Sequence, residues 1–78
     1  MHTIQEIIDL IREINPMLNP EPEEELIKSG KLTSVDVMSL VLALNGNFDI
    51  EITPLELKEE NFRTPQAILE MVERLEEE

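Results

Sequence analysis

Residues 34–48 read SVDVMSLVLALNGNF and hold a single charged side chain, Asp36, in a chain whose residues are 31% charged. Thr33, with Asp36 three residues later, has the pattern of a helix N-cap, so we predict that a helix begins at residue 34. Five apolar residues recur at the three- and four-residue spacing of one helical face, which we expect to be buried. This face consists of Val37, Leu40, Val41, Leu44 and Phe48.

A β-hairpin is the alternative for the end of this stretch. Asn45-Gly46 lies between two apolar segments, which is a strong hairpin signal, and residues 48–52, FDIEI, alternate as a strand does. The residues before Asn45 do not alternate. We therefore favour the helix, and we expect it to fray at residues 45–47.

The predicted helix carries a second apolar face. At about 100° per residue, Val35, Met38 and Leu42 cluster roughly 140° away from the first face. Either the helix is buried on all sides, or these three residues form an exposed surface for a partner protein, since exposed apolar patches on small proteins often mark interaction sites. Methionine suits such adaptable contacts. We call Val35, Met38 and Leu42 the apolar strip.

Residues 4–14 predict an amphipathic first helix. Thr3 and Glu6 have the capping-box pattern at its start, and Asn15-Pro16 ends it because proline disfavours helical backbone in the residue before it. Five isoleucines recur on one face: Ile4, Ile7, Ile8, Ile11 and Ile14.

Two threonine–proline pairs predict the starts of further helices. Thr53-Pro54, with Glu56 completing a capping box, begins a short helix that ends near residue 60. Thr64-Pro65 begins the last helix by the same pattern. We expect the inward face of the last helix to consist of Ile68, Leu69, Val72 and Leu75.

Residues 15–33 form a long connection, in which three prolines within seven residues prevent a continuous helix. We expect one or two helical turns over residues 23–29, stopped by Gly30. Met17 and Leu18 are expected to pack on the core, and the apolar anchors Leu26, Ile27 and Leu32 indicate an ordered loop. The sequence thus predicts a single domain, residues 1–78, with an all-α bundle of three main helices plus one short helix.

Composition excludes several classes of function. The formal net charge of −12 argues against binding to nucleic acid or to anionic membranes, because phosphates would be repelled. The chain has no cysteine, so it forms no disulfide and has no thiol nucleophile of its own. No apolar stretch approaches the ~20 residues of a membrane span, and the N-terminus does not read as a signal peptide. We expect a soluble, cytoplasmic monomer.

Catalytic and metal sites are not predicted. His2 is the sole histidine, and nothing in the sequence brings it to a serine. With 18 acidic residues, neighbouring carboxylates arise by chance, and they fit no metal-binding pattern. We therefore expect no intrinsic enzyme activity.

The run GKLTSV at residues 30–35, the apolar helix after it, and FDIEI at residues 48–52 together resemble the acyl carrier protein family. Members of that family typically show Gly, two residues, Asp-Ser-Leu, a helix, and a phrase close to F-D-I-E-I. Thr64-Pro65 with Ala67-Ile68 also resembles the entry to the family's final helix. The resemblance covers roughly residues 26–72 and implies the same small helical bundle.

This resemblance implies a carrier function. Ser34 matches the serine to which a phosphopantetheinyl transferase attaches 4′-phosphopantetheine from coenzyme A, and the thiol of that arm then holds an acyl, aminoacyl or peptidyl group as a thioester. The implied partners are that transferase, an activating ligase, and a downstream synthase or transferase of fatty acid or secondary metabolite biosynthesis. The positions that match the family's partner-binding helix are Val35, Asp36, Met38 and Leu42.

The sequence departs from the family at two places. Thr33 stands where the family usually has Asp, and the helix after Ser34 lacks the several glutamates of fatty-acid carriers. The second departure indicates a specialised partner that reads shape and apolar contact, as for stand-alone aminoacyl or peptidyl carriers. Two alternatives stay open: an unmodified adaptor that binds a protein through the apolar strip, and a helical domain unrelated to carriers.

Overall fold

In a computed structural model that describes residues 2–78, each long helix begins directly after a threonine. The threonine hydroxyl accepts a hydrogen bond from the backbone N–H three residues on, at 3.4 Å for Thr3, 3.2 Å for Thr33 and 3.0 Å for Thr64. Each cap satisfies one of the N–H groups that a first helical turn leaves unpaired. The helices are α1 (Ile4–Ile14), α2 (Ser34–Phe48) and α4 (Pro65–Glu76), so the three predicted starts are confirmed.

The predicted short helix is divided in two, a 3₁₀ turn η1 (Pro54–Glu56) and a helix α3 (Glu59–Phe62). The capping box predicted here is wrong, because Thr53 makes no side-chain cap and the Glu56 carboxylate accepts hydrogen bonds from Arg74 instead. Residues 2–78 contain no strand, so the hairpin alternative is also wrong. The predicted all-α bundle of three main helices plus one short helix is confirmed.

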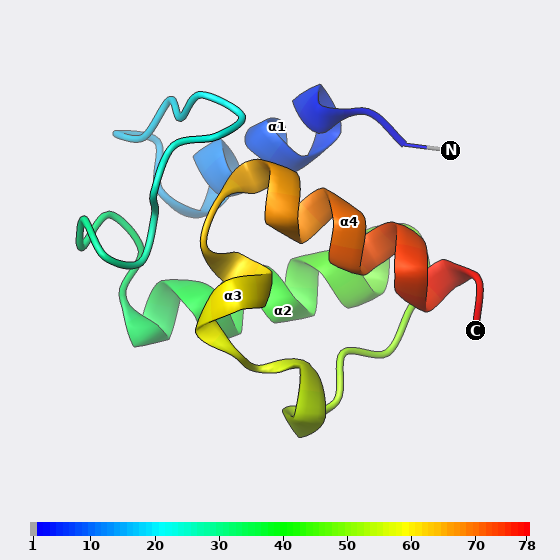
Figure 1. Ribbon diagram of the computed structural model, residues 1–78. Helices are drawn as coiled ribbons and strands as arrows, with labels where there is room; N and C mark the ends of the chain where they lie inside the picture. The colour runs from blue at the N-terminus through cyan, green and yellow to red at the C-terminus, as the bar shows by residue number, and fades with distance from the viewer. Residues whose placement is uncertain (1) are drawn as a thin grey trace.

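The three long helices pack on one another in pairs, and α3 packs on α4 (Figure 1). The long connection lies at one end of the bundle, beside the start of α2, while both chain termini lie towards the other end. η1 projects from the side of α2 that faces away from α1. This arrangement leaves the first turns of α2 between the long connection and the η1–α3 segment.

The core is aliphatic apart from two phenylalanines. The predicted inward faces of α1, α2 and α4 are buried or half-buried, and Leu10 and Met71 extend them. Full burial of one such side chain stabilises the fold by about 1.5–3 kcal/mol. The core cluster is Ile7, Leu10, Ile11, Leu26, Leu32, Leu40, Val41, Leu44, Phe48, Ile52, Phe62, Ile68, Leu69, Met71 and Val72.

The long connection is anchored to the core by the three apolar residues predicted for it. Leu26 and Leu32 are buried, Ile27 is half-buried, and the backbone N–H of Leu26 donates to the carbonyl of Arg63 at 2.7 Å. The expected helix within residues 23–29 is replaced by hydrogen-bonded turns, which end at Gly30 with φ of 77°. A positive φ of this kind favours glycine, because it has no Cβ.

The two loop residues expected on the core behave differently. Leu18 packs partly against it, as predicted. Met17 is 90% exposed, so its prediction is wrong. The side-chain oxygen of Asn15 accepts a hydrogen bond from the Met17 N–H at 3.1 Å, and this local turn holds Met17 at the surface.

The predicted fraying at residues 45–47 is also wrong. α2 continues to Phe48, whose ring is buried, and ends at Asp49 in the left-handed conformation with φ of 53°. The amide of Asn47 donates to the carbonyl of Ala43 at 2.7 Å, and the amide oxygen of Asn45 accepts from the Ile52 N–H at 2.9 Å. Burial of Phe48 therefore outweighs the weak helix propensity of these residues.

Candidate functional site

Ser34 is the first residue of α2 and its side chain is exposed. A reciprocal cap fixes the helix start: Thr33 N–H donates to Asp36 Oδ2 at 3.1 Å, and Asp36 N–H donates to Thr33 Oγ1 at 3.2 Å. The N–H groups of Ser34 and Val35 have no partner within residues 2–78. Backbone N–H groups at a helix start, together with the positive end of the helix dipole, favour an anion such as a phosphodiester.

A pocket of about 310 Å³ lies beside Ser34. One wall comes from α2 and the end of the long connection, and the opposite wall comes from the residues between η1 and α4. The wall residues are mostly apolar, and Lys58 and Glu59 are the charged ones among them. The lining consists of Ile27, Leu32, Thr33, Ser34, Val37, Met38, Leu57, Lys58, Glu59 and Phe62.

The apolar strip is exposed. Val35 is 74%, Met38 54% and Leu42 72% accessible to solvent. The alternative in which α2 is buried on all sides is therefore wrong, and the predicted separation of two faces is confirmed. Leu40 and Leu44 on the other face are fully buried.

The predicted site residues are brought together in part. Met38 lines the pocket with Ser34, while Val35 and Leu42 lie on the outer surface of the same helix. Asp36 is half-exposed and caps the helix. It is also the only charged residue of α2.

One further apolar residue belongs to this site and was not predicted. Leu57 lines the pocket and is 41% exposed. It belongs to no periodic pattern in the sequence, since it follows the short turn η1. Only the fold, which brings Leu57 to the pocket beside Ser34, connects the two residues.

His2 lies at the other end of α2 from Ser34. Its Nε2 is 2.7 Å from Glu76 Oε2, its Nδ1 is 3.5 Å from Glu6 Oε2, and its ring packs edge-on against Phe48 at 4.4 Å between centroids. The hydrogen bond with Glu76 raises the pKa of His2, and Glu6 acts in the same direction. The helix of 15 residues separates His2 from Ser34 by about 20 Å at 1.5 Å per residue.

Metal-binding clusters and membrane-spanning helices are both absent from residues 2–78. Within residues 2–78, no three acidic or histidine side chains converge closely enough to bind a metal ion. No helix over the same residues combines the length and the apolar character that crossing a membrane requires.

The chain is similar to known proteins over most of its length. The phosphopantetheine attachment site family matches residues 5–72, which run from α1 into α4. A D-alanyl carrier protein of Staphylococcus xylosus is 27% identical over 73 residues, and the alignment covers 91% of this chain and 94% of that protein. Both matches span the pocket, the apolar strip and the capped start of α2.

Proposed function

Since the chain belongs to the phosphopantetheine attachment site family, we propose that Ser34 is the attachment residue. The protein then holds an activated acyl, aminoacyl or peptidyl group as a thioester and presents it to partner enzymes. The single observation that carries this proposal is the exposed hydroxyl of Ser34 at the capped N-terminus of α2, inside the matched region.

The residues around Ser34 fit a phosphopantetheine arm. The free N–H groups of Ser34 and Val35 are suited to hold a phosphodiester oxygen, and the apolar pocket wall beside Met38 is suited to the arm's less polar part. When attached, the group supplies the thiol that the cysteine-free chain lacks. The chain contributes position: the Thr33–Asp36 cap fixes the helix start from which the arm extends.

The cargo that we place first is an aminoacyl group of the D-alanyl kind. The relative named as a D-alanyl carrier aligns over nearly the whole of both chains. The sparse charge of α2 also differs from the acidic helix of fatty-acid carriers, as the sequence predicted. Fatty acyl and peptidyl groups are the alternatives that a loading assay distinguishes.

The partners that follow from this function are a phosphopantetheinyl transferase, a ligase that activates the cargo, and a downstream transferase or synthase. We propose that they bind through Val35, Asp36, Met38 and Leu42, because these residues follow Ser34 on the same helix and three of them form the exposed apolar strip. The protein acts as a carrier without catalysis of its own, as a monomer in the cytoplasm.

Intact-protein mass spectrometry tests the proposal. The purified protein is incubated with coenzyme A and a broad-specificity phosphopantetheinyl transferase. We expect a mass increase of one phosphopantetheine, which Ser34→Ala abolishes. Absence of any increase with several transferases would contradict the proposal.

A second candidate is an unmodified adaptor that keeps the carrier fold and binds a protein through the apolar strip. Thr33 favours it, because the family usually has Asp at this position. This candidate predicts that Ser34→Ala leaves biological activity intact, whereas the carrier function predicts complete loss. Complementation of a strain lacking the gene with Ser34→Ala therefore separates the two.

A further inference from the structure

The wall of the Ser34 pocket that faces α2 belongs to a segment with little hydrophobic anchorage. Between the buried residues Ile52 and Phe62, none of residues 53–61 is buried. Three of the pocket's lining residues, Leu57, Lys58 and Glu59, lie in this stretch. Segments with few buried apolar contacts open locally at low free energy, so their position depends on the polar contacts that hold them.

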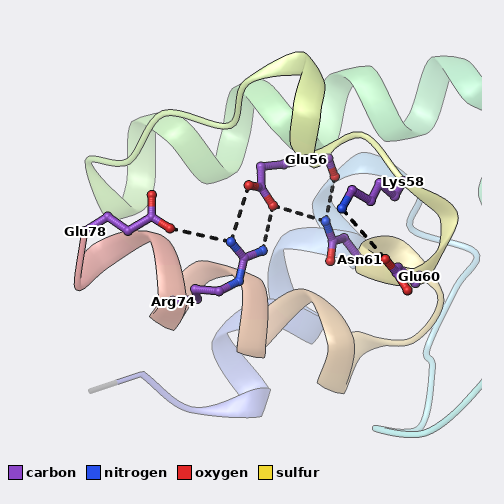
Figure 2. A network of polar contacts seen from close by, with 6 residues as sticks. All are labelled: Glu56, Lys58, Glu60, Asn61, Arg74 and Glu78. Atoms are coloured by element: carbon purple, nitrogen blue, oxygen red, sulfur yellow. Dashed lines mark hydrogen bonds and ion pairs between the residues drawn. The ribbon is translucent and has the colours of Figure 1, made fainter.

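Those polar contacts converge on Glu56, the residue directly before Leu57. Its carboxylate accepts hydrogen bonds from both terminal nitrogens of Arg74, at 2.6 and 3.3 Å (Figure 2). Asn61 Nδ2 donates to the Glu56 backbone carbonyl at 2.8 Å and to Glu56 Oε1 at 3.2 Å. The side chain of Asn61 thereby ties α3 to η1, and Arg74 ties both to α4.

Within residues 2–78, residues 53–61 hydrogen bond to one side chain outside their own segment, that of Arg74. It stands on α4, whose inner face is anchored in the core by the fully inaccessible Ile68 and Val72. A two-pronged guanidinium–carboxylate contact fixes orientation as well as distance. The hydrogen bond from Arg74 also lowers the pKa of the Glu56 carboxyl, so the pair stays ionised at neutral pH.

We propose that Glu56 and Arg74 form a latch that holds residues 53–61 against the bundle and thereby sets the width of the pocket beside Ser34. Arg74 is then a positioning residue: it touches neither Ser34 nor the pocket, but acts through Glu56 on Leu57, Lys58 and Glu59. The use of the pocket by a group carried on Ser34 rests on the proposed function, whereas the latch itself does not.

Hydrogen–deuterium exchange of the unmodified protein tests the latch. The N–H groups of Leu57, Lys58 and Asn61 donate to carbonyls within the segment, so their exchange reports its opening. In Arg74→Gln we expect these groups to exchange about two- to fivefold faster, the range that exposed ion pairs contribute to an equilibrium. Arg12→Gln is the matched control, because Arg12 is exposed on α1 and forms no ion pair within residues 2–78.

A charge swap shows whether the pair itself is responsible. Glu56→Arg combined with Arg74→Glu restores opposite charges at the same two positions, so exchange in the double variant should return towards the wild-type rate. The latch is overturned if these N–H groups exchange at the wild-type rate in Arg74→Gln. It is also overturned if they exchange as fast in the double variant as in Arg74→Gln.

A second readout tests the link to the pocket. With butyryl-phosphopantetheine installed on Ser34, we expect hydroxylamine to cleave the thioester faster in Arg74→Gln than in wild type or in Arg12→Gln. If Arg74→Gln exchanges its N–H groups faster but its thioester is cleaved at the wild-type rate, the link between the latch and the pocket is overturned. Failure to load Ser34 in any variant contradicts the proposed function instead, and the exchange measurement on unmodified protein still decides the latch.

Discussion

The two faces of α2 are both apolar in sequence and opposite in burial. Leu40 and Leu44 are fully buried, whereas Leu42, two residues from each of them, is 72% exposed and Val35 is 74% exposed. Side chains of similar chemistry thus stabilise the fold on one face and remain free to meet a partner on the other. An exposed apolar face beside an exposed hydroxyl suits the proposed carrier, which would dock repeatedly on enzymes.

Truncation of one leucine on each face of α2 should give the largest difference in the free energy of unfolding. Leu44→Ala leaves a cavity in the core and should reduce the free energy of unfolding by about 2–5 kcal/mol. Leu42→Ala removes an exposed side chain and should change it by less than about 0.5 kcal/mol. Urea denaturation followed by circular dichroism measures both, and equal losses would show that the two faces are not distinct.

A charge introduced on the exposed face should affect partners rather than stability. Met38→Glu places a carboxylate in an apolar contact, and we expect an affinity loss of about 30-fold or more for the phosphopantetheinyl transferase, as for a central interface residue. Met17→Glu is the matched control, since Met17 is 90% exposed and lies in the long connection. Transferase binding measured by calorimetry should be unaffected in the control, and equal losses in both variants would contradict a specific role of the strip.

The smallest effect concerns the C-terminal end of α2, where His2 packs on Phe48 between two glutamates. The pKa of His2 is raised in the folded protein, chiefly by its hydrogen bond with Glu76. Its contribution to stability is therefore fully present below the unfolded pKa of ~6.5 and is lost as pH rises through the folded value. We expect Tm to fall slightly from pH 6 to pH 8 in wild type.

His2→Gln should remove that part of the pH dependence. Differential scanning calorimetry at a series of pH values measures it, with Ser34→Ala as a control that keeps the histidine. A fall in Tm of the same size in His2→Gln would assign the pH dependence to other groups.

Local sequence signals predicted the capped helix starts and both faces of α2, because caps and apolar periodicity act over a few residues. Met17 is held at the surface by its local turn with Asn15, whereas the failed predictions for the end of α2 and for the cap of η1 concern residues whose positions depend on distant contacts. Phe48 is buried against other helices and carries α2 past Asn45-Gly46. Glu56 lies close in sequence to Thr53 but binds Arg74, 18 residues away.

In the candidate site, too, the local sequence predicted some residues, whereas others are placed by distant contacts. Ser34 and the apolar strip were predicted from one continuous stretch of sequence. The opposite pocket wall was not, because Leu57 reaches α2 only through the path of the η1–α3 segment across the bundle. Partner-binding and attachment roles for these residues stay predictions.

The most direct test of the carrier function is to locate the modification within the chain. Trypsin cleavage after Lys31 and Lys58 yields one peptide that holds Ser34 together with Ser39, Thr33 and Thr53. After treatment with coenzyme A and transferase, fragmentation of this peptide should place a single phosphopantetheine on Ser34. A group on any other hydroxyl of the peptide, or an unmodified peptide, would contradict the account.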